Sequence, residues 1–117
     1  MLRIYAYRSC DGCRRALKWL EARGIPFEEL AIRKQPPSRD ELETMLAARG
    51  SLKAMFSTSG KDYREMGLSG KVDGMSTEEA FDLMTGNGNL VKRPFVIGEG
   101  VALQGFREKE WEAAFEG

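Results

Sequence analysis

The first 32 residues most constrain what this chain can fold into, because they have the pattern of a strand, a helix and a second strand. Residues 2–7, LRIYAY, and residues 26–32, PFEELAI, both have the apolar and aromatic character of short strands. Between them, apolar side chains recur at spacings of three and four residues, as on one buried helix face: Cys13, Ala16, Leu17 and Leu20. Gly24 and Pro26 would end this helix. Because strands joined through a helix pair in parallel, the segment predicts the start of an α/β fold.

The middle of the chain, about residues 38–85, is predicted to be entirely helical. The stretches Ser38–Glu41 and Ser76–Glu79 each fit a capping box, in which a serine and a glutamate satisfy free N–H groups at a helix start. Apolar side chains follow each box on one helical face: Leu42, Met45 and Leu46 after the first, and Ala80, Phe81 and Met84 after the second. Residues 51–56 and 61–66 are shorter helical candidates.

Strand character returns near the end of the chain. Residues 94–98 and 101–105 are apolar runs, and the turn at 98–100, Gly-Glu-Gly, predicts a hairpin between them. A last helix has apolar side chains three and four residues apart: Trp111, Ala114 and Phe115. The predicted order is β-α-β, an all-helical insertion, and β-β-α. We expect the insertion to pack on the sheet, so that residues 1–117 form one domain.

The composition excludes several classes of function. With 18 basic and 18 acidic residues the formal charge is zero, which argues against direct nucleic-acid binding and against adsorption to acidic lipid. No apolar run approaches the roughly 20 residues of a membrane span, and the N-terminal residues lack the apolar region of a signal peptide. We therefore expect a cytoplasmic protein. The absence of histidine removes Ser–His and Cys–His catalytic pairs and the commonest transition-metal ligand.

Cys10 and Cys13 are the only cysteines, and four interpretations of this pair compete. A zinc site needs four ligands, and no further cysteine or histidine can complete one. A structural disulfide across so short a loop would contribute only about 2 kcal/mol, against about 4.7 kcal/mol for a loop of a hundred residues. A buried thiol without function suits Cys13, which lies on the apolar helix face, but not Cys10, whose neighbours are polar.

A redox-active pair accounts best for the placement. Cys10 lies where the first predicted strand passes into the helix, and the free N–H groups of a helix start favour an anion. Such positions lower the pKa of a thiol from about 8.5 into the range of about 3.5 to 7.5, and only the thiolate attacks a disulfide. Cys13 lies about one helical turn farther along. The pattern therefore predicts Cys10 as the nucleophile, Cys13 as the resolving thiol, and no metal site.

Several stretches together resemble the ArsC/Spx family of thioredoxin-like proteins. They are the C-x-x-C motif after the first strand, WLEARGIPFEE, the helical insertion, and LVKRPFVIGEG followed by GFREKEW. The resemblance covers about residues 2–115. It implies an α/β, thioredoxin-like fold with a β-α-β … β-β-α core and an all-helical insertion.

The resemblance also implies which residues bind a substrate. In ArsC-type arsenate reductases the cysteine after the first strand attacks arsenate, and three arginines hold the oxyanion. Cys10 corresponds to this cysteine, Arg93 and Arg107 correspond to two of the arginines, and Lys53 stands where the third would fall. Lysine offers a point charge instead of a planar fork. Pro94 corresponds to the family's proline beside the active cysteine and is expected in the cis form. Without the resemblance, the three cationic residues would be interpreted as solvated surface charges.

Three functions are open at this point. The first is a thiol–disulfide oxidoreductase that reduces a small disulfide, a thiol adduct, a protein disulfide or an oxyanion. It would bind no cofactor and would use glutathione, an equivalent small thiol, or a thioredoxin or glutaredoxin as reductant. The second is an Spx-like regulator in which the pair senses oxidation and the surface binds the RNA polymerase α subunit. The third is genuine arsenate reduction, which Cys13 and Lys53 disfavour. We expect a monomer in each case.

Overall fold

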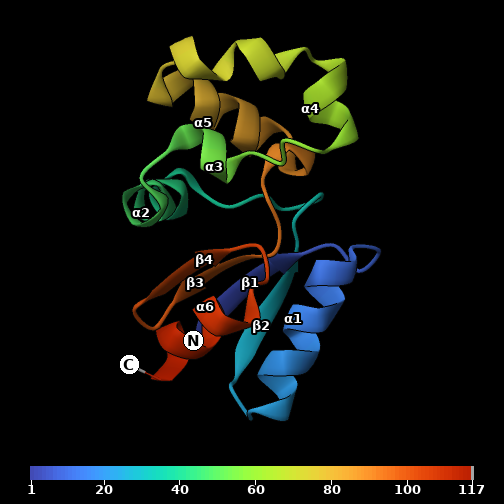
Figure 1. Ribbon diagram of the computed structural model, residues 1–117, viewed down its shortest axis with the longest axis vertical. Coiled ribbons are helices and arrows are strands. Elements are labelled where there is room, and N and C mark those ends of the chain that lie inside the picture. Colours follow the sequence, from blue (N-terminus) through green and yellow to red (C-terminus); the bar gives the residue numbers. More distant parts are fainter. Residues whose placement is uncertain (117) are drawn as a thin grey trace.

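A computed structural model describes residues 1–116 of the chain and shows a four-stranded sheet (Figure 1). The strands are β1 (Leu2–Ala6), β2 (Phe27–Ala31), β3 (Phe95–Gly98) and β4 (Val101–Gln104). Their order across the sheet is β2-β1-β3-β4. The β1–β2 pair is parallel, and the β1–β3 and β3–β4 pairs are antiparallel. The parallel pair, the hairpin and the mixed α/β class predicted from the sequence are therefore confirmed.

Six α-helices and three short 3₁₀ helices complete the described part of the chain. The α-helices are α1 (Asp11–Ala22), α2 (Arg39–Arg49), α3 (Leu52–Met55), α4 (Lys61–Glu65), α5 (Thr77–Gly86) and α6 (Glu108–Glu116). The 3₁₀ helices are η1 (Leu68–Gly70), η2 (Val72–Gly74) and η3 (Gly88–Leu90). In Figure 1 the elements from α2 to α5 lie together on one side of the sheet, apart from α1 and α6. Across residues 1–116, no helix combines the length and apolarity that crossing a membrane requires.

Two hydrophobic clusters hold the helices to the sheet, one on each of its faces. The first joins α1 and α6 to the sheet through side chains that include Leu2, Ile4, Val96 and Leu103, together with Trp111 of α6. All four residues predicted for the apolar face of α1 are buried in it. Because neighbouring residues of a strand point to opposite faces, the alternate β1 residue Tyr5 belongs to the second cluster.

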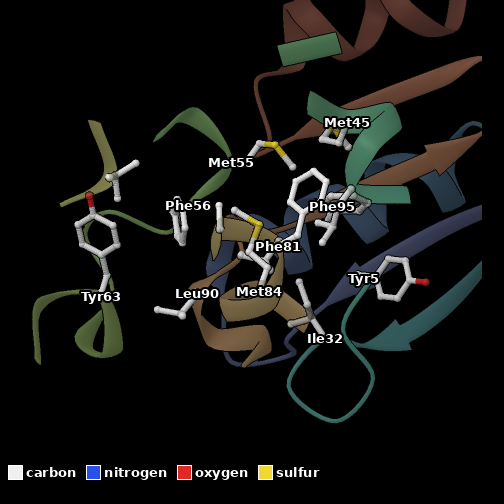
Figure 2. Close-up of a cluster of buried hydrophobic side chains, with 14 of the residues drawn as sticks. Tyr5, Ile32, Met45, Met55, Phe56, Tyr63, Phe81, Met84, Leu90 and Phe95 are labelled. Carbon is white, nitrogen blue, oxygen red and sulfur yellow. The ribbon is translucent and has the colours of Figure 1, made fainter. Parts of the chain in front are cut away.

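The second cluster holds the helical insertion on the opposite face of the sheet (Figure 2). The ring of Tyr5 meets that of Phe95 edge to face, with centroids 5.7 Å apart. Around these two sheet residues gather buried side chains of the insertion, among them Met45, Met55, Phe81 and Met84. The insertion shares this apolar core with the sheet.

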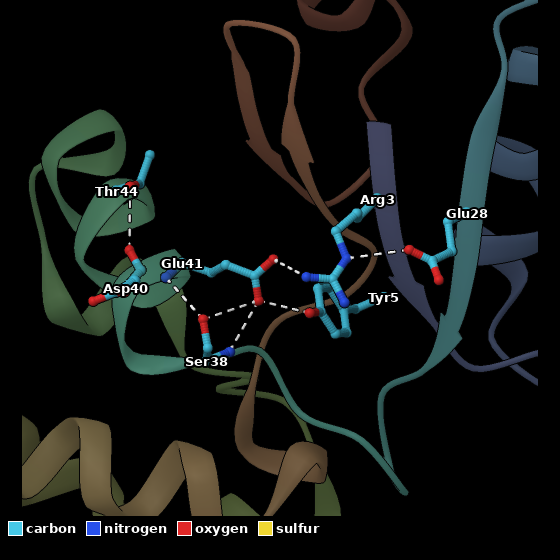
Figure 3. A network of polar contacts seen from close by, with 7 residues as sticks. All are labelled: Arg3, Tyr5, Glu28, Ser38, Asp40, Glu41 and Thr44. Carbon is cyan, nitrogen blue, oxygen red and sulfur yellow. Dashed lines mark hydrogen bonds and ion pairs between the residues drawn. The ribbon is translucent and has the colours of Figure 1, made fainter. Parts of the chain in front are cut away.

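A polar contact also ties the insertion to β1 (Figure 3). Glu41, in the first turn of α2, accepts a 2.6 Å hydrogen bond from the Tyr5 hydroxyl and pairs with Arg3 at 3.2 Å. The same carboxylate accepts from the backbone N–H of Ser38 at 3.0 Å, which completes the predicted capping box. Glu41 therefore caps its own helix and anchors that helix to the sheet.

The second predicted capping box is only half formed. The Ser76 hydroxyl accepts from the backbone N–H of Glu79 at 3.1 Å. The Glu79 carboxylate lies 3.4 Å from that hydroxyl and does not return a bond to the backbone of Ser76. Glu79 is solvent-exposed, whereas the sheet residues Arg3 and Tyr5 hold the carboxylate of the first box. The sequence pattern therefore identified the start of α5 correctly and one of its two capping contacts wrongly.

Candidate active site

Cys10 is the N-cap residue of α1, as the sequence predicts. Its backbone is extended, with φ −86° and ψ 121°, and its Sγ accepts a hydrogen bond from the N–H of Cys13 at 3.4 Å. The backbone N–H of Cys10 donates to the carbonyl of Tyr7 at 2.9 Å, which closes the turn after β1. The sulfur therefore occupies the place of a capping oxygen and faces the positive end of the helix.

Cys13 lies within the first turn of α1 and is fully buried against the sheet. Its Sγ accepts a hydrogen bond from the backbone N–H of Tyr7 at 3.5 Å. Burial is the main cause that raises the pKa of the Cys13 thiol to about 12, and the neighbouring Cys10 sulfur adds to the effect. Both cysteines are free thiols in this structure. A buried, protonated sulfur beside a half-buried one is the asymmetry expected of a resolving and an attacking thiol.

Arg93 is the charged side chain that acts on Cys10. Partial burial is the largest single influence on this thiol and would raise its pKa. Contacts with Cys13, together with the nearby positive charge of Arg93, outweigh that effect and hold the pKa of Cys10 below its ordinary value. Arg93 also lies over the ring of Tyr7, 5.1 Å from its centroid, and its Nη1 is buried without a hydrogen-bond partner among residues 1–116.

Sheet topology explains why Arg93 reaches Cys10. Strand β3 lies beside β1 and runs antiparallel to it. The residue before β3 therefore lies at the same end of the strands as the residues that follow β1. The peptide bond between Arg93 and Pro94 is cis, in agreement with the expectation, and Pro94 is buried. Two segments more than eighty residues apart in sequence are therefore brought together by one strand pairing.

A cavity of about 240 Å³ opens in front of Cys10. Besides Cys10 and Arg93 it is lined by Lys92 and by Phe56 and Ser57–Ser59, the segment that follows α3. The backbone N–H groups of Ser57 and Lys92 donate to Leu90 and Met55, respectively, so the two walls of the cavity are joined to each other. The sequence analysis did not single out Lys92 or Ser57–Ser59. The position of Lys92 directly before Arg93 could have indicated that it lies near the site. Nothing in the sequence of Ser57–Ser59 indicates that this turn reaches Cys10.

The structure does not bring Arg107 or Lys53 to this cavity. Arg107 follows β4, which lies one strand farther from β1 than β3 does, and it lines a neighbouring cavity of about 290 Å³. Lys53 lies on the solvent-exposed side of α3. The buried residue of this short helix is Met55, which packs into the core. Lys92 lines both cavities and supplies a positive charge that the resemblance assigned to Lys53.

Two positively charged side chains line the Cys10 cavity. Within residues 1–116, no three His, Cys, Asp or Glu side chains gather as metal ligands. The two cations at the Cys10 cavity, Lys92 and Arg93, form no salt bridge with any residue of that part of the chain. The site therefore combines a thiol whose pKa is lowered with two positive charges that no carboxylate of the described residues pairs.

Comparison with known proteins agrees with this geometry. The family model of the ArsC family matches residues 5–114. The uncharacterized protein YusI of Bacillus subtilis is 42% identical over 113 residues, covering 95% of each chain. The global transcriptional regulator Spx of Listeria innocua is 31% identical over 111 residues, covering 94% of this chain and 83% of Spx. A crystal structure of an ArsC family related protein from Bacteroides fragilis superposes with a TM-score of 0.88 at 37% identity, covering 97% and 96% of the two chains. The chain therefore belongs to the ArsC family and has its thioredoxin-like fold.

Proposed function

We propose that this protein is a thiol–disulfide oxidoreductase in which Cys10 attacks and Cys13 resolves. The observation that carries the proposal is the environment of the Cys10 sulfur. It accepts a hydrogen bond from the N–H of Cys13, lies beside the guanidinium of Arg93, and lines an open cavity. A sulfur held in this way is accessible, and its lowered pKa favours the thiolate, which is the form that attacks a disulfide.

The reaction would proceed in two exchanges. The Cys10 thiolate attacks one sulfur of a substrate disulfide, the sulfur–sulfur bond breaks, and half of the substrate leaves as a thiolate that takes up a proton. Cys13 then loses its proton and attacks the Cys10 sulfur, so that the second half of the substrate leaves and a Cys10–Cys13 disulfide forms. Two electrons pass from the protein to the substrate. An external dithiol protein of the thioredoxin type, or two small thiols such as glutathione, would return them.

The raised pKa of Cys13 fits the order of these steps. At pH 7 a thiol with a pKa of about 12 is almost entirely protonated, so Cys13 does not compete with Cys10 for the substrate. In the mixed disulfide Cys10 no longer carries a negative charge. The part of the Cys13 shift that comes from the neighbouring sulfur is then removed. Cys13 would therefore become a better nucleophile only after the first exchange has taken place.

The pH dependence of alkylation at Cys10 tests the proposal. Cys13→Ser leaves Cys10 as the single thiol, and its rate with iodoacetamide should rise at a pH below the ordinary thiol pKa of about 8.5. Arg93→Gln should move the rise of the rate toward higher pH, and Lys53→Gln, a matched loss of charge outside the cavity, should not. A rate for the Cys13→Ser protein that rises only near the ordinary thiol pKa of about 8.5 would refute activation of Cys10.

A redox-sensing regulator is the second candidate. It is favoured by the similarity to Spx over almost the whole chain. The resemblance also implies that Spx proteins have a redox pair with the spacing of Cys10 and Cys13. Such a protein would use the same two exchanges as a switch and would bind the C-terminal domain of the RNA polymerase α subunit. A binding titration with that domain, in reduced and oxidised protein, separates the two functions. Arsenate reduction is a third candidate, and turnover of arsenate with glutathione and glutaredoxin would test it.

A further inference from the structure

Tyr7 contacts each of the three groups on which the proposed chemistry depends. Its backbone N–H donates to the Cys13 Sγ at 3.5 Å, and its carbonyl accepts from the N–H of Cys10 at 2.9 Å. The guanidinium of Arg93 lies over its ring, 5.1 Å from the centroid. Tyr7 lines a separate cavity of about 490 Å³ and not the Cys10 cavity. The ring can therefore act on Cys10 through Arg93, and it does not touch a reactant in the Cys10 cavity.

The ring supplies a contact that Arg93 otherwise lacks. The Nη1 atom of Arg93 is buried and has no hydrogen-bond partner among residues 1–116. Because this atom has no exposed surface, only packed protein atoms can compensate for its removal from water. No carboxylate in the same part of the chain forms a salt bridge with Arg93. The face of an aromatic ring attracts a guanidinium within about 6 Å, and Tyr7 provides that face.

Arg33 also lies over this ring, 4.8 Å from its centroid, but its surroundings differ. Arg33 follows β2 and is solvent-exposed, whereas Arg93 is half-buried. Water can solvate the guanidinium of Arg33 if the ring is removed, and it cannot reach the buried Nη1 of Arg93. The ring of Tyr7 therefore matters more for the placement of Arg93 than for that of Arg33.

From these contacts we infer that Tyr7 is a positioning residue that holds the guanidinium of Arg93 beside the Cys10 sulfur. The inference rests on the proposed function for the role of Arg93. Without the ring, neither a carboxylate nor an aromatic face would hold this cation in place, and it would be free to turn toward solvent. Cys10 would then lose the positive charge that favours its thiolate.

The other charged and titratable groups near Cys10 do not depend on the ring. Lys92 lines the same cavity from the segment before β3. Asp11 and Arg14, on the first turn of α1, pair with each other at 3.7 Å. Cys13 keeps its hydrogen bond to the backbone of residue 7 whatever side chain that residue carries. A change of the Tyr7 side chain therefore tests Arg93 and leaves these groups in place.

The pH dependence of alkylation at Cys10, in the Cys13→Ser protein, measures the effect. Tyr7→Leu removes the ring and keeps an apolar side chain. It should move the midpoint of the rate profile upward by about 0.3–0.7 pH units, which is a two- to fivefold change in the thiolate equilibrium and the size expected for one cation–π contact. Tyr7→Phe keeps the ring and should restore the parent profile.

Two comparisons separate positioning from a general effect on packing. In Arg93→Gln protein, Tyr7→Leu should have no further effect on the midpoint, because the group through which the ring acts is absent. Phe106→Leu removes another half-buried ring that lies under an arginine, Arg15 at 5.3 Å, and should leave the midpoint unchanged. An undiminished effect of Tyr7→Leu in Arg93→Gln protein, or equal effects of Tyr7→Leu and Phe106→Leu, would overturn the inference.

A spectroscopic measurement tests the contact whether or not Cys10 is reactive. The ring current of Tyr7 should shift the side-chain NMR signals of Arg93 upfield in the Cys13→Ser protein and with Tyr7→Phe, and Tyr7→Leu should abolish the shift. Arg93 signals that do not respond to Tyr7→Leu would refute the inference. If the shift is present but the alkylation rate rises only near the ordinary thiol pKa of about 8.5, the proposed function fails and the placement of Arg93 by Tyr7 stands.

Discussion

The contact between Tyr5 and Glu41 predicts how strongly the helical insertion is tied to the sheet. Tyr5 is 2% exposed, and its hydroxyl donates to Glu41 at 2.6 Å (Figure 3). Tyr5→Phe removes this donor without changing the shape of the ring, so the edge-to-face contact with Phe95 stays. The Glu41 carboxylate keeps Arg3 and Ser38 as partners. The substitution therefore isolates one hydrogen bond across the boundary between the two layers.

The size of the effect follows from the charge and exposure of the acceptor. A hydrogen bond to a charged group contributes about 1.5–3 kcal/mol. The Glu41 side chain is 14% exposed, so water can replace part of the lost contact. We therefore expect the lower part of that range, about 1.5–2 kcal/mol. For a domain of this length the loss corresponds to a decrease in Tm of about 6–8 °C.

Chemical and thermal unfolding followed by circular dichroism measure the loss, and Tyr63→Phe is the matched control. Tyr63 is also 2% exposed and packs on Phe56 with ring centroids 5.9 Å apart. In contrast to the Tyr5 hydroxyl, the Tyr63 hydroxyl donates to no side chain within residues 1–116. Its removal should change stability by less than about 0.5 kcal/mol. Equal losses for the two variants, or no loss for Tyr5→Phe, would contradict the assignment of Glu41 as an anchor.

Three further predictions concern pH, packing and the cysteines. Burial, with the hydrogen bond and charge of Glu41, raises the pKa of Tyr5 above its ordinary value of 10.0. The stability difference between wild type and Tyr5→Phe should therefore be constant below about pH 10 and shrink above it. Urea titrations at several pH values measure this difference. Gly88→Ala would place a methyl group on the backbone carbonyl of Ile32 and should lower the free energy of unfolding by about 3 kcal/mol or more. Gly86→Ala, with no neighbouring atom within 4 Å, should lower it by less than about 1 kcal/mol. Similar unfolding midpoints for the two variants would contradict the packing around η3. Brief alkylation of the native protein at pH 7 should label Cys10 and leave Cys13 unmodified in peptide mass spectra, because burial raises the pKa of the Cys13 thiol and keeps it protonated at that pH. Equal labelling of the two cysteines would refute the division of roles.

The parts of the candidate site that could be predicted are those near one another in sequence. Cys10 and Cys13 are three residues apart at a strand–helix junction, and the spacing that places Cys13 on the buried face of α1 is visible in the sequence. Arg93 was identified through the resemblance alone. Nothing in its immediate neighbourhood shows that β3 would pair with β1 and carry it to Cys10.

The parts that could not be predicted depend on how the insertion packs. The turn Ser57–Ser59 reaches the Cys10 cavity because Met55 and Phe56 are buried in the core shared with the sheet. Arg107 lines a different cavity from the one the resemblance implies, because it follows β4 and strand β3 lies between β4 and β1. Contacts of this kind join residues far apart along the chain, and local propensity carries no information about them.

The amino-acid sequence by itself determined the local elements of this protein and the position of the proposed nucleophile, Cys10. Hydrophobic spacing, the first capping box and the two cysteines at one helix start are short-range patterns, and their physical consequences are local. Only the tertiary structure decided which charges surround that nucleophile and that a second polar cavity lies beside it. Those features arise from strand order and from the packing of the insertion on the sheet, where many weak apolar contacts act together.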